Sequence, residues 1–293
     1  MPDRVCVLAS GGLDSAVLLG TLARRREVHP VYVRCGLRWE RAEEALLASF
    51  LRVLRGRQGL TVAPLVRLEL PVARLYGGNH WSVSGRGVPG ARAALSSNYL
   101  PGRNLLLASL AAVHCARMRI PELALALLAD NPFPDATPAF LTALGRVASQ
   151  ALGQPIAIRA PFRRLAKEAV IRRGRNLPLA LTLSCASPRG LRHCGQCTKC
   201  AERQRAFARS GIPDPTPYVA TSAGRGFAAP GTPRARTARE QSRGSRERQR
   251  AATGVRGHRS TAARVAREER TGPREWIHHL QPPRGGGTLP PVA

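Results

Sequence analysis

The chain has 293 residues, with 46 basic and 18 acidic side chains and a formal net charge of +28. This length suffices for one large domain or two smaller ones, and a hydrophobic content of 43% excludes a chain too polar to form a core. Only two of the basic residues are Lys, so the excess of Arg reflects the coding bias of a GC-rich genome, and the charge alone supports nucleic-acid binding only weakly.

No apolar run reaches the roughly 20 residues that a membrane-spanning helix needs. The longest, residues 105–116, contains His114 and is more typical of a buried helix. The apolar residues near the amino end are flanked by Asp3 and Asp14, which is unlike a secretory signal peptide. We therefore expect a cytoplasmic protein without a membrane partner.

The first predicted strand is the unbroken apolar row at residues 5–9, which is typical of a buried parallel strand. Two glycines follow, which allow a sharp turn and the close approach of a ligand. A helix continues from residue 16, so Asp14 and Ser15 lie at its amino end, where free N–H groups and the helix dipole favour phosphate. No Lys stands where a Walker A loop requires one.

This pattern predicts a loop that binds a phosphate group, although an ordinary strand–turn–helix corner is the alternative. Residues 10–15 resemble the SGGxDS pyrophosphate loop of the ATP-pyrophosphatase family, which implies that the ligand is ATP. The residues then expected to contact the nucleotide are Leu8, Ala9, Ser10, Gly11, Gly12, Leu13, Asp14, Ser15 and Ala16.

Strands and helices alternate further along the chain. The predicted strands are residues 28–33, 60–68, 123–129 and 156–159, and the predicted helices are residues 39–54, 105–119 and 139–152. Residues 76–99 form a long loop rich in Gly, Pro and Ser, and loops of that length are usually functional or mobile. The alternation predicts an α/β fold with a doubly wound parallel sheet, in which ligands bind at the carboxyl ends of the strands.

The composition divides the chain into three parts. Residues 1–160 are expected to form the ATP-binding α/β domain, and residues 161–218 a small helical lobe that binds metal. Residues 219–293 are expected to be a disordered tail, because the segment 221–293 carries 15 Arg against 5 Glu with almost no apolar periodicity. An RNA-binding tail and a frameshifted gene end both remain open, so the tail carries no functional conclusion.

A cluster of cysteines lies in the second part, at Cys185, Cys194, Cys197 and Cys200. Two overlapping C-x-x-C turns allow several thiolates to point at one centre, and Cys185 completes a tetrahedron, which is the geometry of structural zinc. The spacing therefore predicts one structural Zn²⁺ per chain, with an iron–sulfur cluster or a redox C-x-x-C pair as alternatives.

Three further cysteines lie outside this cluster. Cys6 and Cys115 are in apolar runs and are expected to be buried. Cys35 ends the second strand, but no base is placed beside it, so it is weak evidence for a nucleophile.

Five stretches, taken in order, resemble one branch of the PP-loop ATP-pyrophosphatases, the 7-cyano-7-deazaguanine synthases. They are the SGGxDS loop at 10–15, a segment at 36–43 that resembles the family's G-x-R-x-x-x-E pattern but is one residue longer, the PGRN motif at 101–104, LTxSC at 181–185 and the cysteine motif at 194–200. The resemblance covers residues 4 to about 218 and implies an adenine nucleotide alpha hydrolase-like sheet.

The resemblance implies an ATP-dependent C–N ligase of queuosine biosynthesis. In that family 7-carboxy-7-deazaguanine is activated by ATP, ammonia gives an amide, and a second activation dehydrates the amide to the nitrile. The resemblance implies ATP with Mg²⁺ as a substrate and a homodimer. It makes Asp14, Ser15 and Arg103 the candidate catalytic residues, Arg103 because a guanidinium can bind two oxygens of a carboxylate or phosphate.

Two segments depart from the family pattern where the substrate should be recognised. Residues 131–137 read NPFPDAT in place of a Tyr-Pro-Asp-Cys-Arg segment, and residues 35–39 read CGLRW in place of Tyr-Gly-Gln-Arg-His. Candidate substrate contacts are Arg38, Asn104, Asp130 and Asp135, of which Asp135 is equally consistent with a helix N-cap.

Three other functions therefore remain open at the level of the sequence. They are a paralogue that activates another carboxylic acid, a tRNA-modifying enzyme of the same family, and a non-catalytic zinc-containing RNA-binding protein.

Overall fold

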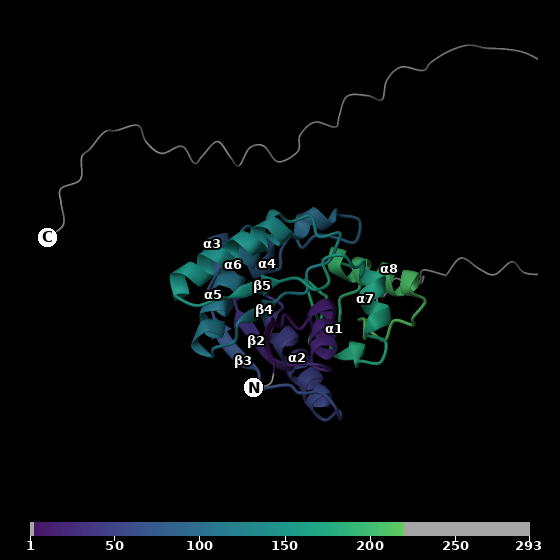
Figure 1. The fold of residues 1–293 in the computed structure, drawn as a ribbon. Coiled ribbons are helices and arrows are strands. Elements are labelled where there is room, and N and C mark those ends of the chain that lie inside the picture. The colour runs from purple at the N-terminus through teal and green to yellow at the C-terminus, as the bar shows by residue number, and fades with distance from the viewer. Residues whose placement is uncertain (1–2, 220–293) are drawn as a thin grey trace, which may run out of the picture. The chain divides into compact units, whose positions relative to one another are not determined.

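The computed structural model describes residues 3–219 (Figure 1). Within them five parallel strands form one sheet in the order β3-β2-β1-β4-β5. The strands are β1 (Arg4–Leu8), β2 (Glu27–Arg34), β3 (Val66–Glu69), β4 (Glu122–Ala124) and β5 (Ala157–Arg159). The predicted tail lies, apart from Val219, outside the described residues.

The direction in which successive strands are added to the sheet reverses beside β1. The chain proceeds outward from β1 to β2 and β3, and then returns to pair β4 with the other edge of β1, where Cys6 lies opposite Leu123. Ligands of such sheets bind at the carboxyl end of this switch point. The predicted α/β class with a parallel, doubly wound sheet is thus confirmed for the described part of the chain.

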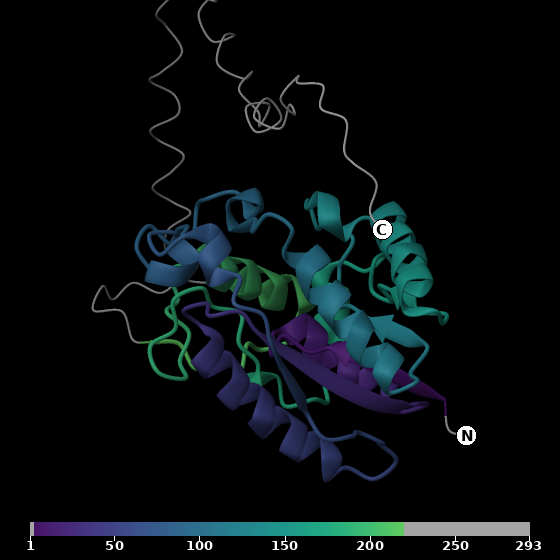
Figure 2. The ribbon, with the colours of Figure 1, turned by 90° about the vertical axis from the view of Figure 1, so that its left-hand side faces the viewer.

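Helices cover both faces of the sheet (Figures 1 and 2). The longer ones are α1 (Leu13–Leu22), α2 (Glu40–Arg55), α5 (Arg103–Arg117), α6 (Pro138–Leu152), α7 (Lys167–Arg173) and α8 (Thr198–Ser210). Successive residues of β1 point to opposite faces, so Cys6 packs in the cluster with α5 and α6, whereas Val5 and Val7 pack with α1, α2 and α7. Because both faces are covered, all three side chains are fully buried.

Two predicted strands are shorter than expected. Residues 60–65 run along the edge of the sheet and pair with β2 only through the bridge between Val28 and Val62. The next residue of β2 that faces this segment is Pro30, which has no N–H to donate. Residues 125–129 stay largely unpaired beyond β4, where β5 has ended, although the Leu125 amide still donates to the carbonyl of Arg159 at 2.8 Å.

The long segment 76–99 is not wholly irregular. It contains the short helix α4 (Trp81–Ser84) and the 3-10 turn η1 (Leu95–Asn98), and the short helix α3 (Ala73–Tyr76) leads into it. Trp81 stacks on Trp39 with ring centroids 5.8 Å apart, which ties this segment to the start of α2. Aromatic packing of this kind was not visible in the composition, in which aromatic residues make up 4%.

The helical segment after β5 packs closely on α1. Val170 and Ile171 of α7 and Phe207 of α8 lie in the same apolar cluster as Val17 and Leu18 of α1. A separate lobe boundary at residue 160 stays a prediction. No helix among residues 3–219 combines the length and apolar character needed to cross a membrane.

Candidate active site

The loop between β1 and α1, residues 10–15, is here called the phosphate loop. Gly11 has φ +71°, and a Cβ there would lie 2.8 Å from the Cγ atom and 2.9 Å from the carbonyl oxygen of Glu43, so only Gly fits. Within the loop the Gly12 amide donates to Ser10 Oγ at 3.3 Å, and Ser15 Oγ donates to the Gly12 carbonyl at 3.0 Å. Gly12 is the N-cap of α1 and offers no side chain to the first-turn N–H groups, which leaves them for an anionic ligand.

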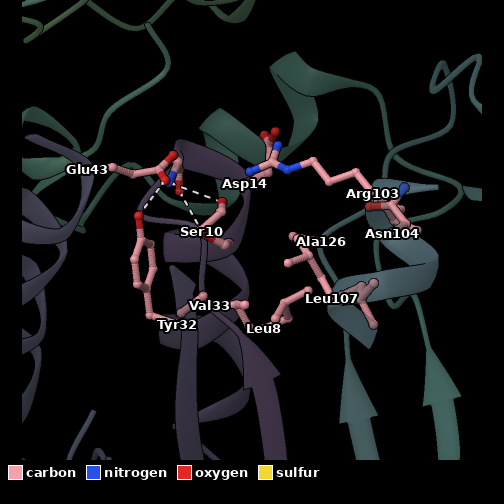
Figure 3. Close-up of a pocket in the computed structure, with 15 residues that line it drawn as sticks. Leu8, Ser10, Asp14, Tyr32, Val33, Glu43, Arg103, Asn104, Leu107 and Ala126 are labelled. Carbon is pink, nitrogen blue, oxygen red and sulfur yellow. Dashed lines mark hydrogen bonds between the residues drawn. The ribbon is translucent and has the colours of Figure 1, made fainter. Parts of the chain in front are cut away.

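A cavity of about 170 Å³ opens at the carboxyl ends of β1, β2 and β4 (Figure 3). The phosphate loop forms one wall and the start of α5 forms the opposite wall. The residues that line the cavity are Leu8, Ala9, Ser10, Gly12, Asp14, Ser15, Tyr32, Val33, Glu43, Arg103, Asn104, Leu107, Leu125, Ala126 and Leu127.

Six of the nine residues predicted to contact the nucleotide line this cavity. The other three are Gly11, Leu13 and Ala16. Leu13 and Ala16 are buried in the apolar cluster beneath α1, and Gly11 packs against Glu43. Within the phosphate loop, four residues therefore face the cavity, while Gly11 and Leu13 anchor the loop to the rest of the protein.

Arg103 places a positive charge in the cavity. It is the first residue of α5, it follows Gly102 in the left-handed conformation, and its guanidinium carbon lies 5.9 Å from the ring centroid of Trp39. Its side chain extends from α5 toward the phosphate loop (Figure 3). The buried Nε has no hydrogen-bond partner among residues 3–219, so Arg103 is poised to bind an anion.

Glu43 is a cavity residue to which the sequence reasoning assigned no role. Its Oε2 accepts a hydrogen bond of 3.0 Å from Tyr32 Oη, and the carboxyl group is buried. Burial raises the pKa of Glu43 to about 8, against the opposing effect of the Arg103 charge. One signal was available: Glu43 shares a helix face with Leu46, Leu47 and Phe50, where an acidic residue is out of place.

Lys167 was also missed by the sequence reasoning. Its Nζ lies 2.9 Å from Asp14 Oδ2 and 2.9 Å from Glu202 Oε1, and its side chain is only 7% exposed. Burial opposes the charged form, but the two carboxylates outweigh it and raise the pKa of Lys167. The rarity of Lys in this chain was the available signal.

Asp14 consequently has two different oxygens. Oδ2 is held by Lys167, whereas Oδ1 is buried without a partner among the described residues. Because Asp14 lines the cavity, Oδ1 is free to accept from a ligand or from water bound to a metal ion.

The predicted substrate contacts do not all reach the cavity. Asn104 lines it, but Asp135 accepts from the Asn104 amide at 2.8 Å and from its Nδ2 at 3.2 Å, so the Asp135 carboxylate caps the start of α5. Arg38 Nη1 reaches the carbonyl of Ser84 at 3.4 Å instead. Asp130 is exposed, and neither Arg38 nor Asp130 lines the cavity.

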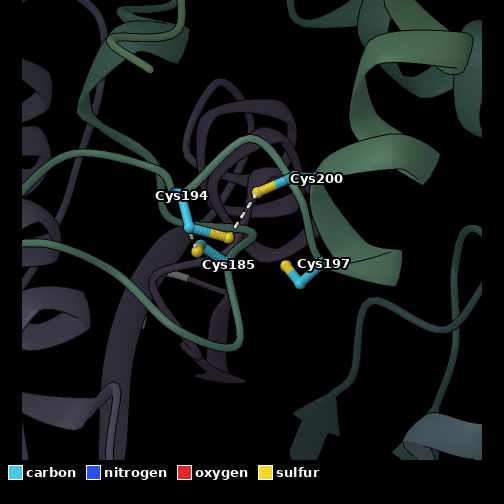
Figure 4. A group of neighbouring side chains, drawn as sticks. All are labelled: Cys185, Cys194, Cys197 and Cys200. Carbon is cyan, nitrogen blue, oxygen red and sulfur yellow. Dashed lines mark hydrogen bonds between the residues drawn. The ribbon is translucent and has the colours of Figure 1, made fainter. Parts of the chain in front are cut away.

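The four predicted metal ligands converge (Figure 4). The sulfur atoms of Cys185, Cys194, Cys197 and Cys200 all lie within 4.8 Å of one another. Backbone N–H groups point at the sulfurs, as the amides of Ser187 and Cys194 do toward Cys185 Sγ at 3.4 and 3.3 Å. Four converging thiols with N–H···S bonds fit a closed tetrahedral metal site. Cys6, Cys35 and Cys115 are buried elsewhere in the core.

Known proteins resemble this chain over most of its length. The model of the family described as queuosine biosynthesis protein QueC matches residues 4–211. A 7-cyano-7-deazaguanine synthase of Anaeromyxobacter sp. (strain Fw109-5) is 36% identical over 74% of this chain and 96% of its own length. The 7-cyano-7-deazaguanine synthase 1 of Desulfitobacterium hafniense is 30% identical over 70% of this chain and 91% of its own. The chain therefore belongs to the QueC family.

Proposed function

We propose that this chain is an ATP-dependent 7-cyano-7-deazaguanine synthase, which converts 7-carboxy-7-deazaguanine and ammonia to the nitrile. The observation that carries the proposal is the cavity between the phosphate loop and Arg103, in a chain that matches the family over residues 4–211. One wall suits the phosphates of ATP, and the other suits an anionic carboxylate that must be held beside them.

The phosphate loop would bind the pyrophosphate end of ATP through the free N–H groups at the start of α1. Asp14 Oδ1, which has no partner among residues 3–219, would accept from the hydration shell of Mg²⁺. Mg²⁺, when bound, neutralises charge on the phosphate oxygens. Lys167 holds the other oxygen, Oδ2, and so fixes the carboxylate of Asp14 in the wall of the cavity.

Arg103 would hold the substrate carboxylate in line with the α-phosphate. A carboxylate oxygen attacks that phosphorus and releases pyrophosphate to give the acyl adenylate. Ammonia then attacks the acyl carbon, AMP leaves, and a proton is lost to give the amide. In a second round the amide oxygen attacks the α-phosphorus of ATP and releases pyrophosphate, and loss of AMP with two protons from nitrogen then forms the nitrile.

The metal in the four-cysteine site would be zinc. Zn²⁺ prefers tetrahedral thiolate coordination, and four sulfur ligands leave no position open for substrate. The site would therefore have a structural rather than a catalytic role, with one zinc ion bound per chain.

We also infer that the protein forms a homodimer, which light scattering coupled to size exclusion would test.

The decisive assay supplies ATP, Mg²⁺, ammonium and 7-carboxy-7-deazaguanine. The expected result is the nitrile, identified by mass, with two AMP released per nitrile and with the amide accumulating when ATP is limiting. Metal analysis of the same sample is expected to give one zinc per chain. Omission of ammonium provides the matched control, in which no amide or nitrile forms.

Two outcomes would replace the proposal. Release of AMP from ATP with other acids, but not with 7-carboxy-7-deazaguanine, would identify a paralogue that activates another carboxylate. An absence of nucleotide turnover, together with RNA binding that is lost on deletion of residues 221–293, would identify a non-catalytic RNA-binding protein.

A further inference from the structure

Both lysines of the chain contact the same carboxylate. Lys167 Nζ lies 2.9 Å from Glu202 Oε1, and Lys199 Nζ lies 2.9 Å from Glu202 Oε2. Elsewhere the chain uses Arg for every basic position. Glu202 thus lies between two ammonium groups, one from α7 and one from α8.

This group of charges lies between the cysteine centre and the phosphate loop. Cys200 and Glu202 are both on α8, which begins directly after Cys197. From Glu202 the path continues through Lys167 to Asp14 Oδ2 in the phosphate loop. A side-chain path of two ion pairs thus connects the helix that carries Cys200 to the wall of the cavity.

A second connection runs through the backbone. The Leu183 amide donates to the Gly11 carbonyl at 2.9 Å, and Leu183 stands two residues before Cys185. The amide of the next residue, Ser184, donates to Nε2 of His193 at 2.9 Å, and His193 immediately precedes Cys194. The segment that contacts Gly11 is therefore tied on its carboxyl side to Cys185 and, through His193, to the residue before Cys194.

We propose that the cysteine centre acts as a positioning device for the phosphate loop, and that Glu202 is the positioning residue that sets Asp14 through Lys167. The proposal deepens the proposed function, since it rests on ATP binding at residues 10–15. It assigns a role to the metal site beyond holding the lobe together: the centre fixes Asp14 Oδ2 through Lys167, and with it the carboxylate of Asp14 in the wall of the cavity.

The preference for Lys at residue 167 has a physical reason. An ammonium group is a compact point charge with three donors, and it can serve two carboxylates in a small buried space. A planar guanidinium with its rigid fork needs more room, and here the side chain of Lys167 is almost completely enclosed.

Glu202→Gln tests the proposal, because Gln keeps the shape of Glu and removes its charge. Three quantities are measured on the full chain: bound metal per chain, the dissociation constant of a non-hydrolysable ATP analogue with Mg²⁺, and amide hydrogen exchange in peptides of residues 9–16. We expect unchanged metal content, a dissociation constant raised about tenfold by the mispositioned loop, and faster exchange in those peptides. Glu168→Gln, beside Lys167 but in no ion pair of the described chain, is the matched control and should change none of them.

The sign of the change in affinity separates this proposal from simple electrostatics. Removal of a negative charge near a triphosphate should by itself tighten binding, so an unchanged or lower dissociation constant in Glu202→Gln would overturn the positioning role. Loss of metal from this variant would overturn it too, because Glu202 would then support the cysteine centre rather than the loop.

Glu202→Asp supplies an independent measure. It keeps the negative charge but shortens the side chain by one methylene group. A dissociation constant between those of the wild type and Glu202→Gln is therefore expected, and a value equal to that of the wild type would contradict the role of the contact between Glu202 and Lys167. If Glu202→Gln does not fold, Glu202→Asp carries the test alone. A wild-type chain that binds the analogue without forming nitrile would refute the proposed reaction and leave this comparison standing.

Discussion

The sequence predicted the residues of one cavity wall more reliably than those of the other. On the phosphate-loop wall, the predicted residues Ser10, Asp14 and Ser15 line the cavity, and Gly11 is required by its contact with Glu43. On the opposite wall, the predicted residues Arg103 and Asn104 line the cavity, but Asp135 is occupied in capping α5, and Arg38 and Asp130 lie away from the cavity.

The difference has a simple origin. The phosphate loop directly follows β1, the central strand, whose carboxyl end must lie at the switch point of the sheet. The residues of the opposite wall come from the starts of α2 and α5 and from the segment after β4, and their side chains can satisfy each other instead of a ligand. A motif attached to a buried strand therefore predicts a site more securely than one carried by loops.

The largest effect is expected at the four-cysteine site, which supports the phosphate-loop wall. Cys200→Ser removes one of four thiolates from the closed site, and metal release is expected to lower the melting temperature by roughly 10 °C or more. Metal analysis and differential scanning calorimetry provide the measurement. Cys115→Ser, a change at a buried cysteine outside the cluster, should keep one ion per chain. Full metal retention in Cys200→Ser would contradict the four-thiolate site.

The loop wall itself is tested by Asp14→Asn, which keeps the shape of the side chain and removes its charge. Nitrile formation is expected to fall by about 10²-fold, because the residue loses both the ion pair with Lys167 and the acceptor strength of Oδ1. Steady-state kinetics provide the measurement, with the exposed Asp130→Asn as control. Equal losses of nitrile formation in Asp14→Asn and Asp130→Asn would contradict the difference between the two walls.

Arg103→Lys tests the positive charge that the start of α5 brings to the cavity. A point charge replaces a fork that can bind two oxygens, so the KM for the carboxylic acid should rise about tenfold, with a smaller change in kcat. Arg38→Lys should stay within about twofold of the wild type, because Arg38 does not line the cavity. A larger effect of Arg38→Lys would indicate that Arg38 contacts the substrate.

Glu43 links the two walls and gives a pH dependence. Its pKa is about 8 in the folded chain against 4.5 for an ordinary Glu, so the folded state retains a proton that the unfolded state loses. Its stabilising contribution is complete below about pH 4.5, decreases as the pH rises from there to about 8, and then levels off. Melting temperatures across this range should fall less steeply in Glu43→Gln. Identical slopes for the two proteins would show that Glu43 titrates normally.

The smallest effect is expected at Asp135. Asp135→Ala removes the cap of α5 and should lower the free energy of unfolding by about 1 kcal/mol, as loss of an N-cap commonly does. Turnover at saturating substrate should remain close to that of the wild type. Urea denaturation gives the first quantity and the nitrile assay the second. A stable Asp135→Ala protein without activity would instead make Asp135 a substrate contact.

Local patterns were sufficient for the architecture and for the two centres with short-range signatures. The apolar row before Ser10 predicted the central strand, the β/α alternation predicted the parallel sheet, and the close spacing of Cys194, Cys197 and Cys200 predicted the metal cluster. Each of these signals depends on neighbours within a few residues, where chain geometry leaves few arrangements.

The extent of the weaker strands was not predictable in this way. Residues 60–65 have the apolar character of a strand, but whether an extended segment pairs depends on the partner beside it. The same holds for residues 125–129, where the neighbouring strand β5 ends at Arg159.

The sequence by itself determined the fold class, the phosphate loop and the cysteine cluster, because each is written in a contiguous or nearly contiguous stretch. Only the tertiary structure decided that Lys167 holds Asp14 across 153 positions of the chain, that Glu43 faces the cavity, and that Asp135 caps a helix 31 residues before it. The physical reason is that a charged side chain is committed by whichever partners the folded core brings within hydrogen-bond distance.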